Sequence, residues 1–178
     1  LPNKDGKIAA DQIDACCREH FSSGNAEHMV QPGMVYVSNP TEYGTLYTKA
    51  ELEAIGKVCR KYDLILFVDG ARMAYGLGAE GNDLTLADYA AISDVFYIGG
   101  TKAGALFGEA VVITDERLKK DFRYMIKRQG GMLAKGRLLG IQYEVLMEDD
   151  LYTELGRHAN VLAAKIKEAF LRKGYESY

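Results

Sequence analysis

Two polar residues follow apolar runs that are predicted to be buried strands, and both could do chemistry. Asp69 follows residues 64–68, and Lys102 follows residues 95–98 and a Gly99-Gly100-Thr101 turn. Ligands of open α/β sheets bind beyond the carboxyl ends of the strands, so the two side chains are expected to share a ligand site. A lysine amine that can bond an aldehyde and an acid that can keep a ring nitrogen protonated are the two groups that pyridoxal phosphate (PLP) requires.

The same residues also have an ordinary structural explanation. An Asp at a strand end often caps the next turn, and an exposed Lys is common. In favour of a ligand, a buried strand-end carboxylate is costly unless a cationic or protonated group meets it, and glycines on both sides of Lys102 leave room for a planar molecule. From spacing alone, both interpretations stay open.

The elements that must position these residues follow a strand–helix–strand order. A β-prone run at 34–37 ends at Pro40, and Thr48-Lys49-Ala50-Glu51 is a capping box that opens a helix to about Tyr62. With the strand at 64–68, this gives a right-handed βαβ unit. A helix at 10–21 is expected before it, and a strand at 110–113 is expected after a hairpin-like stretch.

Three further helices are predicted in the C-terminal half. They cover about 114–129, 133–148 and 151–173, and Gly130-Gly131 separates the first two. The segment Gly76-Leu77-Gly78-Ala79-Glu80-Gly81 fits G-x-G-x-x-G, but no strand ends directly before it and no helix opens on it. A dinucleotide site is therefore not predicted.

Composition favours one α/β domain, or part of a larger one, and argues against several other classes. The 178 residues, 48% of them hydrophobic, can bury one sizeable core. The formal charge is −3 without a basic stripe, no run of about 18 apolar residues occurs, and the first residues lack a signal-peptide pattern. Nucleic-acid and membrane partners are not expected. The odd number of cysteines, three, favours reduced thiols and hence a cytoplasmic protein. The three histidines lack metal-ligand spacing, so no metal site is predicted.

Two motifs resemble those of a known family. They are Phe67-Val68-Asp69-Gly70-Ala71-Arg72 and Tyr97-Ile98-Gly99-Gly100-Thr101-Lys102-Ala103-Gly104, which look like the aspartate and lysine motifs of the threonine aldolase and β-eliminating lyase family. The likeness runs from Asp5-Gly6-Lys7-Ile8 to Lys127-Arg128-Gln129-Gly130-Gly131-Met132. Members are fold-type-I enzymes that depend on PLP.

The resemblance implies a three-layer α/β fold, the large domain of PLP-dependent transferases, with a mostly parallel sheet. A long helix then leads toward a small domain that is largely absent. We expect residues 1–150 to form the PLP-binding domain, incomplete at its N-terminus, and residues 151–178 to form the linking helix and the start of the small domain. The family's phosphate-binding and ring-stacking residues and its C-terminal carboxylate-binding Arg match nothing in this sequence, so a central portion of a longer enzyme is expected.

The resemblance also implies roles for the site residues. Asp69 pairs with the pyridine nitrogen, Lys102 forms the Schiff-base link, and Arg72 lies on the substrate and cofactor side of the pocket, where its planar fork suits a carboxylate. The alternative for Arg72 is a surface salt bridge. Thr101 either hydrogen-bonds the cofactor or shapes the turn.

The sequence departs from the family pattern in the 39–42 loop. Asn39-Pro40-Thr41-Glu42 stands where many threonine aldolases have Asn-Thr-His-Asn, so the histidine that helps handle the β-hydroxyl is missing. Thr41 or Glu42 is a hypothetical substitute. Asn39 and Thr41 are therefore candidates for the substrate pocket, although Asn39 equally suits a turn.

A second departure follows the paired glycines, where Leu133 replaces an Arg of the relatives. Lys127 or Arg128 is a candidate to compensate, and Arg128 is the third pocket candidate, although both also suit the solvated last turn of a helix. In the family this region approaches the neighbouring subunit's cofactor. A homodimer or homotetramer with shared sites is therefore expected.

The expected activity is that of a lyase that splits the Cα–Cβ bond of a β-hydroxy-α-amino acid, converting threonine or allo-threonine to glycine and acetaldehyde. β-Elimination with the same cofactor is one alternative. An inactive chain that contributes only an oligomer interface is the other.

Overall fold

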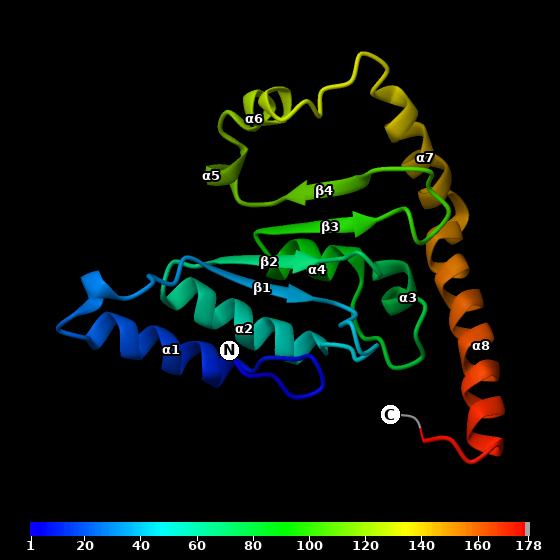
Figure 1. The fold of residues 1–178 in the computed structure, drawn as a ribbon. Helices are drawn as coiled ribbons and strands as arrows, with labels where there is room; N and C mark the ends of the chain where they lie inside the picture. The colour runs from blue at the N-terminus through cyan, green and yellow to red at the C-terminus, as the bar shows by residue number, and fades with distance from the viewer. Residues whose placement is uncertain (177–178) are drawn as a thin grey trace.

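A four-stranded sheet forms the centre of the computed structural model, which describes residues 1–176 (Figure 1). Its strands lie in the order β1 (Met34–Ser38), β2 (Ile65–Asp69), β3 (Val95–Gly99) and β4 (Glu109–Ile113). The first three are parallel, whereas β4 returns antiparallel to β3. The prediction of a mostly parallel α/β sheet is confirmed.

Eight α-helices surround or extend this sheet within the described residues. They are α1 (Ala10–Ser22), α2 (Lys49–Lys61), α3 (Met73–Leu77), α4 (Leu86–Ile92), α5 (Glu116–Lys119), α6 (Phe122–Arg128), α7 (Arg137–Met147) and α8 (Leu151–Arg172). Short 3₁₀ turns occur at Ala26–His28 and Glu148–Asp150. No helix in residues 1–176 has both the length and the apolar character needed to cross a bilayer.

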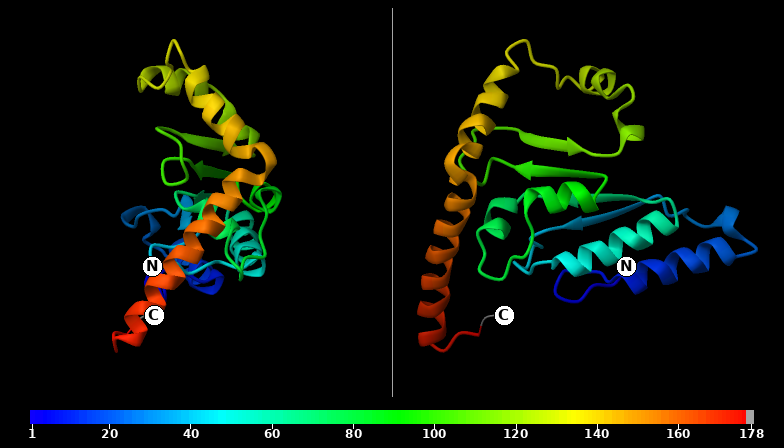
Figure 2. Two further views of the ribbon diagram at one scale, coloured as in Figure 1. Left: turned by 90° about the vertical axis from the view of Figure 1, so that its right-hand side faces the viewer. Right: turned by 180° about the vertical axis from the view of Figure 1, so that it is seen from behind.

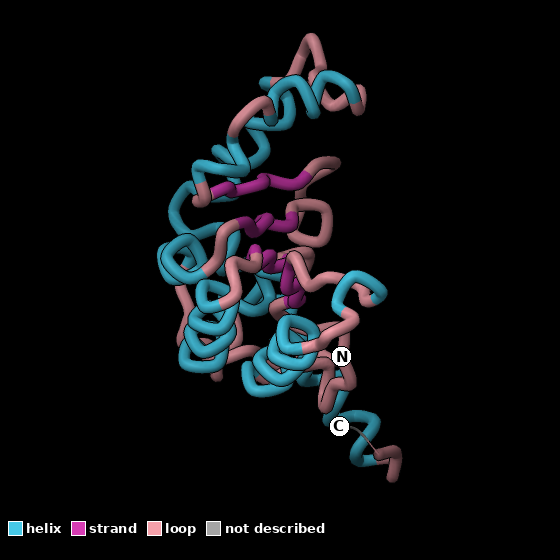
Figure 3. The backbone as a smooth tube through the Cα atoms, turned by 90° about the vertical axis from the view of Figure 1, so that its left-hand side faces the viewer, coloured by secondary structure: helices cyan, strands magenta, loops and turns pink. Residues whose placement is uncertain are grey.

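Helices cover one face of the sheet and leave the other open. Val35, Leu66 and Phe96 point from neighbouring strands into the core, where α2 and α4 pack against β2 and β3. Because successive strand residues point to opposite faces, Met34 and Tyr36 lie on the other side, and each is about half exposed. Figure 3, in which the strands are seen nearly end-on, shows the helices gathered on one side.

The segment after β4 differs from the expected continuous helix over 114–129. Asp121 has a left-handed φ of 57°, which interrupts the helical backbone between α5 and α6. The expected helix at 133–148 begins only at Arg137. Neither α3 nor α4 was expected, although Thr85 and Asp88 form a capping box at the start of α4.

The long helix α8 lies alongside α3 because two glycines bring their backbones together. A Cβ placed on Gly156 would lie 1.9 Å from the carbonyl oxygen of Ala74, and one on Gly78 would lie 2.4 Å from the backbone nitrogen of Arg157. Part of the G-x-G-x-x-G segment therefore serves helix packing. Figure 2 shows α8 running along the side of the molecule. The division of the chain into residues 1–150 and 151–178 stays a prediction. Residues 177 and 178 lie outside the part of the chain that the structure describes.

Candidate active site

Asp69 and Lys102 lie at the same edge of the sheet. Asp69 is the last residue of β2, and Lys102 stands three residues after Gly99 in the loop between β3 and β4. Because β2 and β3 are parallel, both residues lie at the carboxyl ends of their strands. Their charges interact, since the Lys102 ammonium favours the ionised form of Asp69. The structure therefore brings together the two residues singled out in the sequence.

Two glycines allow the backbones that carry these residues to meet. A Cβ on Gly70 would lie 1.9 Å from the carbonyl oxygen of Tyr97, and one on Gly99 would lie 2.7 Å from that of Gly70. The N–H of Gly99 donates to the carbonyl oxygen of Gly70 over 3.0 Å. No larger residue could occupy either position without moving one strand end away from the other.

The Asp69 carboxylate is held by donors on both of its oxygens. Tyr36 donates its hydroxyl to Oδ2, and the Ala71 N–H donates to Oδ1 over 2.9 Å. Burial raises the pKa of Asp69, but hydrogen bonds from Tyr36, Tyr97 and the Ala71 N–H, together with the charge of Lys102, outweigh it and leave this pKa below its usual value. Asp69 is thus an ionised carboxylate at neutral pH.

Three tyrosine hydroxyls from helices fasten the loop that carries Lys102. Tyr75 of α3 donates to the carbonyl oxygen of Lys102 over 2.6 Å. Tyr152 of α8 donates to that of Gly99 over 2.6 Å, and Tyr143 of α7 lies within hydrogen-bonding distance of the carbonyl oxygens at both ends of the loop. Lys102 itself is exposed, so a fixed backbone presents a side chain that can reach a ligand.

Arg72 lies next to this edge and forms an ion pair. Its guanidinium nitrogen stands 2.7 Å from a carboxylate oxygen of Glu42, whose side chain is 71% exposed. The salt-bridge alternative is therefore what the structure shows. Arg72 also lines an open cavity of about 680 Å³ between the loop after β1, α3 and α8, together with Tyr75 and Arg157. The guanidinium can still meet a carboxylate ligand because its present partner is a solvated side chain.

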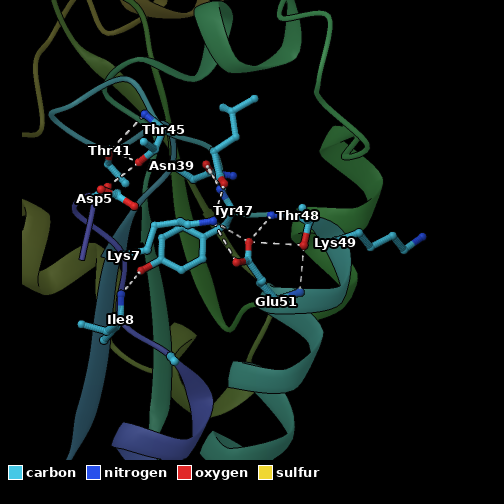
Figure 4. Close-up of polar contacts among 12 residues, drawn as sticks. Asp5, Lys7, Ile8, Asn39, Thr41, Thr45, Tyr47, Thr48, Lys49 and Glu51 are labelled. Carbon is cyan, nitrogen blue, oxygen red and sulfur yellow. Dashed lines mark hydrogen bonds and ion pairs between the residues drawn. The ribbon is translucent and has the colours of Figure 1, made fainter. Parts of the chain in front are cut away.

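The Asn39 side chain is buried and stabilises the fold through two hydrogen bonds. The side chain is 1% exposed, its amide nitrogen donates to the Tyr89 hydroxyl over 2.6 Å, and its oxygen accepts the N–H of Tyr47 over 3.0 Å. Thr41 is likewise buried and shares a 2.6 Å hydrogen bond with Thr45 (Figure 4). Both side chains shape the loop after β1, and we propose no substrate contact for them.

A second set of contacts, also drawn in Figure 4, ties this loop to the N-terminal segment and to α2. The Lys7 ammonium lies 2.8 Å from the carboxylate of Glu51 and donates to the carbonyl oxygen of Leu46 over 3.0 Å. The Tyr47 hydroxyl accepts the N–H of Ile8 over 2.8 Å. The loop is therefore fixed on both sides, and Glu42 projects from it toward Arg72.

The remaining two predicted site residues are exposed. Thr101 lies in the turn before Lys102, and no hydrogen bond within residues 1–176 uses its hydroxyl. Arg128 ends α6, which Figure 1 shows beyond β4 and away from the end of β2. The structure does not bring Arg128 to Asp69, and its approach to a neighbouring subunit stays a prediction.

The sequence matches the β-eliminating lyase family over residues 1–174. The chain belongs to this family. Two curated relatives are low-specificity L-threonine aldolases, one from Pseudomonas aeruginosa at 33% identity over 141 residues and one from a Pseudomonas species at 35% over 136 residues. These matches cover 79% and 75% of this chain but only 41% and 38% of the relatives. This family member thus spans less than half the length of either.

Solved structures agree with this membership. The Leishmania major threonine aldolase superposes with a TM-score of 0.92 at 49% identity, over 99% of this chain and 50% of that chain. A PLP-bound C–S lyase from Staphylococcus hominis superposes with a TM-score of 0.62 at 15% identity, over 97% of this chain and 43% of that one. The second likeness shows that the family member shares the fold of that lyase.

Proposed function

We propose that this chain is part of a PLP-dependent lyase that splits threonine or allo-threonine into glycine and acetaldehyde. The observation that carries the proposal is the placement of an ionised Asp69 beside a loop-fixed Lys102 in a member of the β-eliminating lyase family. The names of the similar proteins support a β-hydroxy-α-amino acid as substrate.

The residues at this edge fit pyridoxal phosphate. Asp69 carries the negative charge that keeps a proton on a ring nitrogen, and Lys102 has an exposed amine that would hold the cofactor's aldehyde carbon. When bound, this cofactor withdraws electrons from the substrate α-carbon. Arg72 would bind the substrate carboxylate through its planar fork, in place of or beside Glu42.

Glu42 is the side chain of the 39–42 loop that can take the proton of the β-hydroxyl. Thr41 is buried with its hydroxyl engaged, whereas Glu42 is exposed and lies beside Arg72. A carboxylate at this position can act as a general base. β-Elimination is the second candidate, because the loop has no histidine at this point and the family is named for that reaction.

Reductive trapping tests the cofactor lysine. PLP is added to this chain and to the full-length protein, borohydride is added, and the modified peptide is identified by mass spectrometry. We expect the adduct at Lys102, its loss in Lys102→Ala and its retention in Lys120→Ala, which removes an exposed lysine distant in sequence from the site. An adduct that survives Lys102→Ala contradicts the assignment.

Product analysis on the full-length protein then separates the two reactions. Cleavage of threonine gives glycine and an aldehyde, whereas β-elimination gives a keto acid and ammonia. We also expect a homo-oligomer and a cytoplasmic location, as the resemblance and composition suggest.

A further inference from the structure

Three aromatic rings form a row on the open face of the sheet, next to Asp69. Tyr36 of β1 stacks on Phe67 of β2 with ring centres 5.2 Å apart and planes 18° from parallel. Tyr97 of β3 meets the other side of Phe67 edge-on, with centres 6.1 Å apart. The Phe67 ring therefore contacts the rings of both tyrosines.

This row aims two hydroxyls at one carboxylate. The pairing of Phe67 with Val95 places Asp69 beside Tyr97 two residues further on, and β1 places Tyr36 on the other side. Tyr36 donates to Oδ2 of Asp69, and the Tyr97 hydroxyl, on the neighbouring strand, also lowers the pKa of this carboxylate. An Asp that only caps the turn after a strand needs one hydrogen bond, and the Ala71 N–H already provides it. The two phenols are not required for this cap.

Both phenols stay protonated, and hence stay donors, throughout the range in which an enzyme works. Burial and the hydrogen bond to Asp69 raise the pKa of Tyr36 to about 12, and the same causes raise the pKa of Tyr97 further. Neither hydroxyl can take a proton from Asp69. Their effect on Asp69 therefore has one direction, which is to stabilise its charged form.

We infer that Tyr36 and Tyr97 are positioning residues that hold Asp69 ionised and directed at the ring nitrogen of the bound cofactor. This inference rests on the proposed function. A proton shared by a carboxylate and a ring nitrogen lies on the more basic group, and two hydroxyl donors make Asp69 the less basic one. The proton then stays on the nitrogen, where it makes the ring an electron acceptor.

The first test needs no cofactor. Aspartate labelled with ¹³C in its carboxyl carbon is followed by NMR during an acid titration, and the Asp69 signal is identified by its loss in Asp69→Asn. We expect Tyr36→Phe and Tyr97→Phe each to raise the midpoint of Asp69 by roughly one pH unit, and the double variant to raise it further. Phenylalanine keeps the aromatic row, so a structural role alone would not move this midpoint.

Tyr124→Phe is the matched control, because Tyr124 is 77% exposed on α6 and should leave the Asp69 midpoint unchanged. If the double variant does not fold, the ionisation of tyrosine is measured in Asp69→Asn by its ultraviolet absorbance. Loss of the carboxylate should then lower the midpoints of Tyr36 and Tyr97, which are identified by their loss in Tyr36→Phe and Tyr97→Phe. An unmoved Asp69 midpoint in folded Tyr36→Phe and Tyr97→Phe, or unmoved tyrosine midpoints in Asp69→Asn, overturns the inference.

A second readout uses the PLP-loaded full-length protein. The absorbance of bound PLP is recorded against pH, and we expect this pH dependence to change in the double variant, with a weaker signal of the protonated ring at low pH, because the shared proton moves toward the more basic Asp69. If borohydride traps PLP at Lys102 but this pH dependence is unmoved, the inference fails alone. If nothing is trapped at Lys102, the proposed function fails, while the cofactor-free titration still decides whether the tyrosines hold Asp69 ionised.

Discussion

The low pKa of Asp69 links the site to the stability of the fold. A carboxyl group whose pKa is lower in the folded chain contributes stability above its unfolded pKa, and this contribution is lost as the pH falls through the folded pKa. We therefore expect the free energy of unfolding to exceed that of Asp69→Asn at pH 6 and the difference to shrink below about pH 4. Urea unfolding followed by circular dichroism from pH 3 to 6 measures it. A constant difference would contradict this expectation.

The residues of the site differ in how far the sequence could predict them. Asp69 and Lys102 could be predicted because each follows an apolar strand and lies in a family motif. Tyr36 and Tyr97 were missed because their contacts with Asp69 depend on which strands are neighbours and in what register. The burial of Asn39 could not be predicted either, because its side chain hydrogen-bonds to Tyr89, which lies 50 residues away in the sequence.

Among the elements, the contact between α3 and α8 gives the sharpest test. Gly156→Ala would push a methyl group into the backbone of α3, and we expect it to destabilise the chain by about 1–3 kcal/mol. Gly140→Ala in α7 is the control, because no atom lies within 4 Å of the added methyl group. There we expect a gain of about 0.5–1 kcal/mol, since alanine favours a helix. Chemical denaturation of both variants measures the two effects, and equal signs would contradict them.

Local signals decided which elements could be predicted. The capping box of Thr48 and Glu51 located the start of α2, and the structure confirms both of its hydrogen bonds. The capping box at the start of α4 has Asp88 where the usual sequence pattern has Glu or Gln, so the sequence does not predict this helix. The expected helix at 114–129 was wrong because apolar spacing continues through Lys120 and Asp121, whose non-helical backbone separates α5 from α6.

At the scale of the whole molecule, helices of the C-terminal half stabilise the loop that carries Lys102 through hydrogen bonds from Tyr143 and Tyr152. Tyr152 is buried and its hydroxyl is bonded to the carbonyl oxygen of Gly99, so Tyr152→Phe leaves that oxygen without this donor at a cost of about 1–3 kcal/mol. We expect faster amide hydrogen exchange in the 100–108 loop. Tyr124→Phe should change neither stability nor exchange, and unchanged exchange in Tyr152→Phe would show that α8 does not hold the loop.

The fold class could be predicted because it depends on the order of strands and helices, which follows from periodicity and turn residues. The packing of α8 could not be predicted, because it depends on Gly78 and Gly156. These two glycines allow close contact only once both helices lie side by side. The open face of the sheet was also not foreseen, since Tyr36 and Phe67 have the apolar character expected of strands covered on both faces.

Two parts of the site differ in their tolerance of mutation: the packed surroundings of Asp69, and the exposed ion pair of Glu42 and Arg72. Asp69 stands between tyrosines and close to glycines with no space for a side chain, so most substitutions there disturb the sheet itself. Glu42, in contrast, is solvated and makes its ion pair across the surface. Substitutions at position 42 can therefore change the solvated side of the site while the packing around Asp69 stays the same.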